Sequence, residues 1–172
     1  AGGMLRFGIP AYRLPRDVLD REVARILAAG VILTLNHKVE DVLKERDQGG
    51  FDAVFMAIGA HLAKRVDIPA REAGKILDAV SFLEQASLAE EQGLPPPKLG
   101  RRVAIYGGGN TAMDAARTAR RLGVEEAMII YRRDREHMPA HAFEADEAEE
   151  EGIKINWLRS IRQLDSTSIE VE

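Results

Sequence analysis

Hydrophobic positions follow two different spacings along the chain and predict helices and strands in alternation. After Pro15, apolar residues recur at helical spacing until Gly30, which predicts a helix with a glycine at its C-terminal end. Two nearly continuous apolar runs, 31–35 and 51–58, predict short strands covered on both faces of a sheet. The second run ends at Gly59.

The middle of the chain contains residues that interrupt regular structure. Apolar spacing over 77–86 predicts one helix. The run Gly-Leu-Pro-Pro-Pro at 93–97 is incompatible with a helix or a central strand, because proline lacks an amide donor and fixes φ. We therefore expect residues 63–100 to connect two lobes, 1–62 and 101–172.

The second lobe has the clearer pattern. Apolar strands are expected at 103–106, 127–131 and 153–158, and helices at 110–122 and 140–151. Small residues on one face of the first helix (Ala112, Ala115, Ala116, Ala119) would let it approach a sheet closely. Strand–helix–strand–helix–strand is half of a dinucleotide-binding fold. The expected class is α/β, with a Rossmann-like lobe of three-layer βαβ type.

Composition narrows the chemistry. The 172 residues include no cysteine, so a disulfide, thiolate metal site or iron–sulfur ligand within this chain is excluded. Redox chemistry would need a bound carrier such as a nicotinamide or flavin. A formal net charge of -4 argues against nucleic acid as a partner, and no apolar run is long enough to span a membrane. We take the cytoplasm as the default location.

Two other kinds of site find no support in the sequence. His137 and His141 flank Met-Pro without a carboxylate or cysteine array, so no metal site is predicted. No Ser/His/Asp constellation supports hydrolysis, and we name no catalytic side chain.

The glycine-rich turn after the strand at 103–106 is the principal candidate site. It has the G-x-G-x-x-A form of the dinucleotide fingerprint, between a strand and a helix. The first glycine would allow the tight turn, and the second would let a pyrophosphate approach the helix N-terminus. The alternative is a purely structural turn. The candidate cofactor-binding residues are Gly107, Gly108, Gly109, Asn110, Thr111 and Ala112.

An arginine cluster at the end of the strand 127–131 favours one nicotinamide cofactor. NAD-binding proteins usually carry Asp or Glu at this position to bind the ribose 2′-hydroxyl. This chain has Arg132, Arg133 and Arg135 instead, and guanidinium groups bind a 2′-phosphate well. The pattern favours NADP(H) over NAD(H), with a solvated surface loop as the alternative.

The acidic run that follows is interpreted as the solvent-facing surface of a helix, with acidic charges favoured near its N-terminal half. Its members are Glu144, Asp146, Glu147, Glu149, Glu150 and Glu151.

Several motifs together resemble the glutamate synthase small (beta) subunit family, which includes the flavoprotein part of dihydropyrimidine dehydrogenase. Residues 3–15 resemble the segment after its first flavin-binding βα unit, and 52–60 its second flavin-domain strand. Residues 107–114 and 131–140 resemble its NADPH loop and its 2′-phosphate segment. The resemblance covers nearly the whole chain.

The resemblance implies a protein that passes hydride from NADPH to FAD, and electrons onward to iron–sulfur centres or a partner subunit. It implies that 1–62 is part of an FAD-binding domain and 101–172 the NADPH-binding domain. Leu5 and Arg6 would then lie near the flavin, Val39 near its adenine, and Ala57 and Gly59 along the adenosine diphosphate.

The chain departs from the family pattern in several places. Ile58 stands where the family usually has Thr. The family's cysteine cluster, first glycine fingerprint and C-terminal flavin segment have no counterpart in the sequence. We therefore expect an internal portion of a longer protein, with an incomplete FAD lobe, little retained flavin and no activity alone. The alternatives are a non-catalytic nucleotide-binding or electron-transfer scaffold and, ranked lower without Cys-x-x-Cys, a thioredoxin-reductase-like enzyme.

Overall fold

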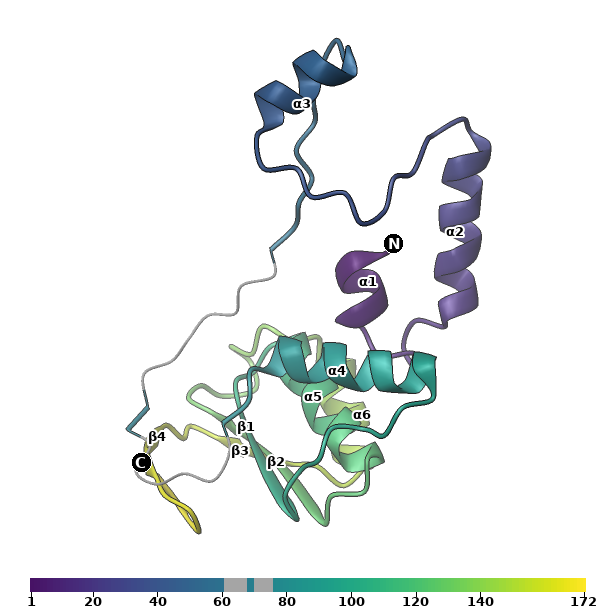
Figure 1. Cartoon of the computed structure of the whole chain (residues 1–172). Helices are drawn as coiled ribbons and strands as arrows, with labels where there is room; N and C mark the ends of the chain where they lie inside the picture. The colour runs from purple at the N-terminus through teal and green to yellow at the C-terminus, as the bar shows by residue number, and fades with distance from the viewer. Residues whose placement is uncertain (61–67, 70–75) are drawn as a thin grey trace.

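The computed structural model describes residues 1–60, 68–69 and 76–172, so part of the expected connecting segment lies outside the described residues. Three helices come first along the chain: α1 (Gly3–Phe7), α2 (Arg16–Ala28) and α3 (Val42–Gly49). The first contacts the second, and also packs on α4 (Ala79–Gln92), which precedes the sheet. Helix α3 stands apart from the sheet (Figure 1).

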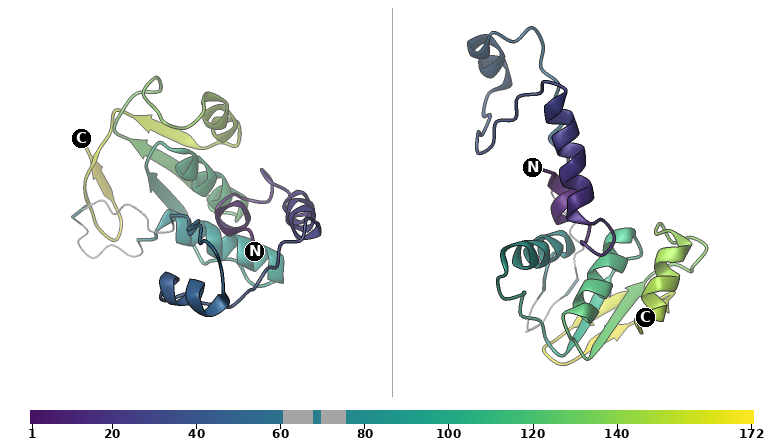
Figure 2. Two further views of the ribbon diagram at one scale, coloured as in Figure 1. Left: turned by 90° about the horizontal axis from the view of Figure 1, so that it is seen from above. Right: turned by 90° about the vertical axis from the view of Figure 1, so that its right-hand side faces the viewer.

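A parallel three-stranded sheet forms the centre of residues 101–172. Its strands β1 (Arg102–Tyr106), β2 (Glu126–Tyr131) and β3 (Lys154–Trp157) lie in the order β1-β2-β3. Helices α5 (Asn110–Arg121) and α6 (Ala142–Glu150) connect them in turn. This arrangement confirms the expected α/β class, because parallel neighbours need such crossover connections. In the described part of the chain, α4, α5 and α6 lie on one side of the sheet (Figure 2).

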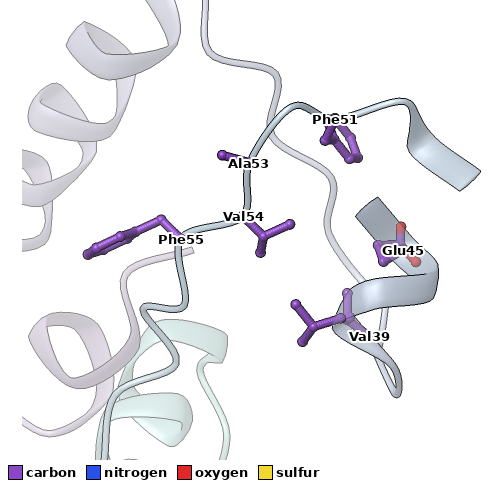
Figure 3. Close-up of a pocket in the computed structure, with 7 residues that line it drawn as sticks. Val39, Glu45, Phe51, Ala53, Val54 and Phe55 are labelled. Carbon is purple, nitrogen blue, oxygen red and sulfur yellow. The ribbon is translucent and has the colours of Figure 1, made fainter. Parts of the chain in front are cut away.

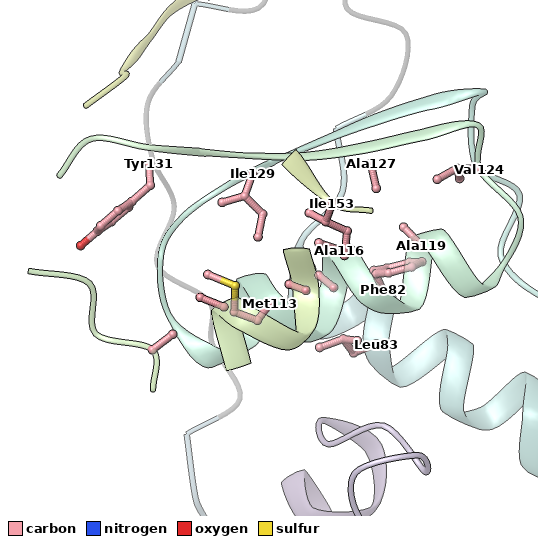
Figure 4. Close-up of a cluster of buried hydrophobic side chains, with 14 residues drawn as sticks. Phe82, Leu83, Met113, Ala116, Ala119, Val124, Ala127, Ile129, Tyr131 and Ile153 are labelled. Carbon is pink, nitrogen blue, oxygen red and sulfur yellow. The ribbon is translucent and has the colours of Figure 1, made fainter. Parts of the chain in front are cut away.

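The core lies between α5 and the sheet (Figure 4). Ala116 and Ala119 of α5 are fully buried, and Ile129 of β2 is buried opposite them. Alanines at these positions let the helix backbone approach the strands, as their spacing predicts. Phe82 and Leu83 of α4 complete the core from the other side of α5.

A two-stranded hairpin follows the sheet and was not anticipated from the sequence. It consists of β4 (Ile161–Leu164) and β5 (Ile169–Val171), which pair antiparallel. Asp165 organises its turn by accepting hydrogen bonds from the backbone N–H groups of Thr167 and Ser168, at 2.7 and 2.8 Å. These hydrogen bonds lower the pKa of Asp165 to about 2. The turn therefore keeps its carboxylate ionised over the ordinary pH range.

The expected strands at 31–35 and 51–58 are wrong for this structure. Both segments have irregular backbone, and Ile32 and Phe55 are 91% and 92% exposed. A strand needs a neighbour to satisfy its backbone N–H and C=O groups. Neither run pairs with a strand anywhere in the described ranges. Their apolar residues therefore form no strand here, and side chains such as Ile32 and Phe55 stay exposed.

The acidic helix also differs from expectation, because its surface is only partly solvated. Glu144 is 1% exposed and forms an ion pair with Arg13 of the N-terminal segment. The same guanidinium donates to Asp114 of α5 at 2.6 Å. Glu151, which follows α6, pairs with Arg117 at 2.7 Å. Buried carboxylates need such partners, so these ion pairs join the N-terminal segment, α5 and α6.

Tyr12 lies beside this network. Its ring is covered by two guanidinium groups, with the carbon of Arg121 4.0 Å and that of Arg117 4.8 Å from the ring centre. Its buried hydroxyl forms no hydrogen bond with any described residue. Burial raises the pKa of Tyr12 to about 12.

We expect Tyr12 to contribute to alkaline unfolding. A raised pKa means that the folded state favours the neutral phenol, so this contribution is complete below pH ~10 and is lost as pH rises towards ~12. Tyr12→Phe should therefore flatten the fall in Tm between pH 9 and 12, while changing Tm little at pH 7. Thermal unfolding followed by circular dichroism measures this, and an equally steep fall in the variant would contradict it.

Candidate dinucleotide site

The turn that leaves β1 is built around Gly107. Its φ of 155° lies in the region that favours glycine, and its N–H donates to the carbonyl of Ile130 at 3.1 Å. A Cβ on this residue would lie 3.5 Å from the Cβ of Ala112. The first glycine and the alanine of the motif therefore serve the strand-to-helix turn, as the fingerprint predicts.

Gly108 and Gly109 face different environments. A Cβ on Gly108 would lie 2.5 Å from the ring of Tyr131, at the end of β2. A Cβ on Gly109 would meet no described atom within 4 Å. Gly109 is the N-cap of α5, so the space beside it adjoins the helix amides that have no intrahelical acceptor. An anionic group could approach those amides.

The loop after β2 has its own internal order. Asp134 accepts from the backbone N–H of His137 at 2.9 Å and contacts its Nδ1 at 2.6 Å. This interaction lowers the pKa of Asp134. The hydroxyl of Tyr131 donates to the carbonyl of His137 at 3.2 Å. The loop therefore folds back over the end of the strand.

The same loop is tied to the glycine turn. The N–H of Ala140 donates to the carbonyl of Gly108 at 3.0 Å. The N–H of His141 donates to Oδ1 of Asn110 at 3.3 Å. With the ring of Tyr131 beside Gly108, these contacts hold the two predicted parts of the site next to each other.

The three candidate arginines do not share one environment. Arg132 and Arg133 are exposed, and their side chains have no hydrogen-bond or ion-pair partner among the described residues. Arg135 instead forms ion pairs with Asp146 and, at 3.1 Å, with Glu149 of α6. Two guanidinium groups therefore remain open to a ligand, while the third holds the loop against α6.

The N-terminal candidates lie on α1, away from the glycine turn. Leu5 is half exposed. Arg6 donates to Glu91 of α4 at 2.7 Å and to Asp20 of α2, and these contacts raise its pKa. Arg6 therefore links three helices here.

Val39, Ala57 and Gly59 fall on the irregular part of the chain. Val39 lines a hollow of about 280 Å³ with Phe51 and Val54 (Figure 3). Ala57 and Gly59 are exposed in irregular chain beyond it. The described residues do not bring these three together with Leu5 and Arg6 into one site.

Sequence reasoning missed the buried polar face of α5. Asp114, Arg117 and Thr118 are all buried, at the spacing i, i+3, i+4. The sequence contains a signal for this burial. The alanine positions and these three polar positions together cover most of the circumference of α5, so few of its residues can face solvent. Arg13, the partner of Asp114, carries no such signal.

No group of three or more His, Cys, Asp or Glu side chains among the described residues could hold a metal ion. None of the helices described is long and apolar enough to cross a membrane.

The sequence profile of the pyridine nucleotide-disulphide oxidoreductase family matches residues 14–172. The chain belongs to this family. Subunit beta of the NADP(+)-dependent formate dehydrogenase of Moorella thermoacetica is 45% identical over 161 residues. The match covers 92% of this chain and 22% of that relative.

The predicted resemblance to glutamate synthase is also confirmed. The NADPH glutamate synthase small chain of Escherichia coli (strain K12) is 34% identical over 163 residues, covering 91% of this chain and 34% of the relative. This member of the pyridine nucleotide-disulphide oxidoreductase family thus spans about a fifth to a third of the length of these relatives.

A solved structure supports the fold assignment. FprA of Mycobacterium tuberculosis in complex with NADPH matches with a TM-score of 0.62 at 21% identity. The match covers 86% of this chain and 38% of FprA. At this identity the likeness establishes the shared fold.

One added methyl group should have different effects on stability at Gly108 and at Gly109. Gly108→Ala should lower the stability by about 1–3 kcal/mol, because its Cβ overlaps the Tyr131 ring. Gly109→Ala should change stability by less than about 1 kcal/mol, because its Cβ enters open space at an allowed φ of -95°. Urea unfolding of the two variants measures this. Equal losses would contradict the described packing.

Proposed function

We propose that the chain binds NADPH between the glycine turn and the loop after β2, as the nucleotide-binding part of an FAD-dependent oxidoreductase. In the whole protein, NADPH passes hydride to FAD, and electrons continue to iron–sulfur centres or a partner subunit. Residues 101–172 form the NADPH-binding domain in this proposal, and 1–62 belong to the FAD-binding domain.

The observation that carries the proposal is the open space beside Gly109, in a turn that contacts the loop of Arg132 and Arg133, whose side chains have no partner among the described residues. In the proposal, the pyrophosphate lies beside Gly109 and accepts from the first amides of α5, whose helix dipole favours negative charge. Gly107 and Ala112 maintain the turn, and Asn110 and Thr111 supply the start of the helix.

The 2′-phosphate is assigned to Arg132 and Arg133. Both follow Tyr131, whose ring packs beside Gly108, so their backbone is next to the glycine turn. Their unpaired guanidinium groups can each donate two hydrogen bonds to phosphate oxygens. Arg135, given the same role by the sequence, is engaged with α6 and supports the loop instead.

The relatives support the choice of cofactor through their names, which specify NADP(+) in the formate dehydrogenase and NADPH in the glutamate synthase. NADPH supplies a hydride, and the residues of this chain bind and orient the nucleotide. Their part in the reaction is positional, since no side chain at the turn needs to exchange a proton.

The described residues fit FAD less well than NADPH. The two apolar runs of the first lobe form no sheet, and the five candidate residues do not converge. We therefore derive no step of flavin chemistry from them.

Removal of the Arg132 and Arg133 side chains tests the cofactor assignment. Arg132→Ala with Arg133→Ala should weaken NADPH binding at least about tenfold, because a hydrogen bond to a charged group contributes about 1.5–3 kcal/mol. NADH binding should change little, since NADH lacks the 2′-phosphate. Calorimetric titration with both nucleotides measures the two affinities.

A matched control is available at the opposite end of the sheet. Arg101→Ala with Arg102→Ala removes the same charge from the start of β1, where the two side chains pair with Glu125 and Glu126. This control should leave the preference for NADPH unchanged. Equal losses of NADPH and NADH in the Arg132/Arg133 variant would contradict the 2′-phosphate assignment.

A spectroscopic experiment separates binding from turnover. We expect the chain to bind NADPH without bleaching the absorbance of added FAD, because its flavin residues do not assemble. Anaerobic mixing followed at the flavin band measures this. Rapid bleaching would show that the chain alone completes hydride transfer and would contradict the expectation.

A further inference from the structure

Arg13 forms a bridge between two helices that it does not belong to. Its Nη1 donates to Oδ2 of Asp114 on α5 at 2.6 Å, and its Nη2 donates to Oε1 of Glu144 on α6. The two carboxylate side chains are 6% and 1% exposed, and the Arg13 side chain is 24% exposed. This is the most deeply buried ion-pair group that the structure describes.

The bridge lies directly behind the nucleotide site. Asp114 is in the second turn of α5, which begins at the glycine loop. Glu144 is in the first turn of α6, whose N-cap His141 donates to Asn110 at the start of α5. Arg13 therefore joins the beginnings of the two helices that frame the glycine turn and the arginine loop.

The electrostatics make the guanidinium necessary to this arrangement. Two buried carboxylates face one position, and each has one oxygen without a partner among the described residues. Burial raises the pKa of Asp114, and the hydrogen bond from Arg13 opposes that rise. Without a bridging cation, the carboxylates would repel each other or require water, and either response would separate the helix starts.

We propose that Arg13 is a positioning residue for the nucleotide site, fixing the glycine turn of α5 relative to the loop before α6. The inference rests on the proposed NADPH function and deepens it. Arg13 contacts no part of the site directly. It acts through the helices, so its loss affects every ligand of the pyrophosphate position and not the 2′-phosphate alone.

Arginine at position 13 can bridge two carboxylates in a way that lysine cannot. Its planar guanidinium presents separate N–H groups to two carboxylates at once, whereas the lysine ammonium is a single point of charge on a flexible chain. Arg13→Lys therefore keeps the charge while removing the rigid two-point bridge. It separates positioning from simple neutralisation.

The test compares Arg13→Lys with Arg25→Lys in the full chain by calorimetric titration with NADPH and NADH. Arg25 is exposed on α2 and pairs only with Glu22 in the described structure, so it is a matched control. Arg13→Lys should weaken both nucleotides by a similar factor of about ten, unlike the selective loss at Arg132 and Arg133. Arg25→Lys should have no effect.

A second variant keeps the inference testable if lysine is not tolerated. Arg13→Met with Asp114→Leu and Glu144→Met replaces the bridge by apolar side chains of similar size, which often preserves stability. This variant should unfold near the Tm of the unchanged chain and still bind both nucleotides about tenfold more weakly. Recovery of full affinity along with stability would overturn the positioning role.

The remaining outcomes are distinguishable. Unchanged NADPH and NADH affinity in a folded Arg13→Lys variant overturns this inference and leaves the proposed function intact. A loss confined to NADPH also overturns it, because that pattern marks a 2′-phosphate contact. Absence of binding of either nucleotide by the unchanged chain overturns the proposed function and this inference together.

Discussion

The close packing of α5 against the parallel sheet is the constraint on which the fold of residues 101–172 depends. Ala116 and Ala119 are fully buried at this contact, so their small side chains let the helix backbone lie close to the strands. The turn between β1 and α5 must then be short and sharp, which Gly107 allows. That geometry leaves the N-terminus of α5 open. The candidate nucleotide position lies at this open N-terminus.

The buried ion pairs extend this constraint to the N-terminal segment. In residues 10–14, Arg13 donates to two carboxylates, Asp114 of α5 and Glu144 of α6, and the Tyr12 ring lies under the guanidinium groups of Arg117 and Arg121. A buried ion pair gives little net stability relative to apolar packing, yet breaking one is costly. The network therefore specifies one relative placement of the segment and the two helices more than it strengthens the fold.

The sequence was most informative where structure is set by neighbouring residues. The strands at 103–106 and 127–131 and the helix that begins at Asn110 lie within two residues of their predicted bounds, because a glycine turn and two periodicities define them. The runs 31–35 and 51–58 failed because an apolar pattern cannot supply a hydrogen-bonding partner strand. The prediction that Glu144 faces solvent was wrong for a related reason, since its burial depends on an arginine 131 positions away in the sequence. The glycine and arginine residues of the site stay predictions, although the fold brings both segments together.

The ion pairs of Arg135 also influence the electric field that an approaching nucleotide meets. Helix α6 carries several carboxylates close to the arginine loop, and their field would repel a phosphate-bearing anion. Arg135 offsets one of the two negative charges of Asp146 and Glu149, and Arg117 offsets one of the two on Glu147 and Glu151. The positive potential of Arg132 and Arg133 therefore extends outward with less cancellation, in a protein of net negative charge. Association of an anion with this surface therefore depends on the local arrangement of charges and not on the net charge of the chain. The association rate should decrease as salt screens the field of the two arginines.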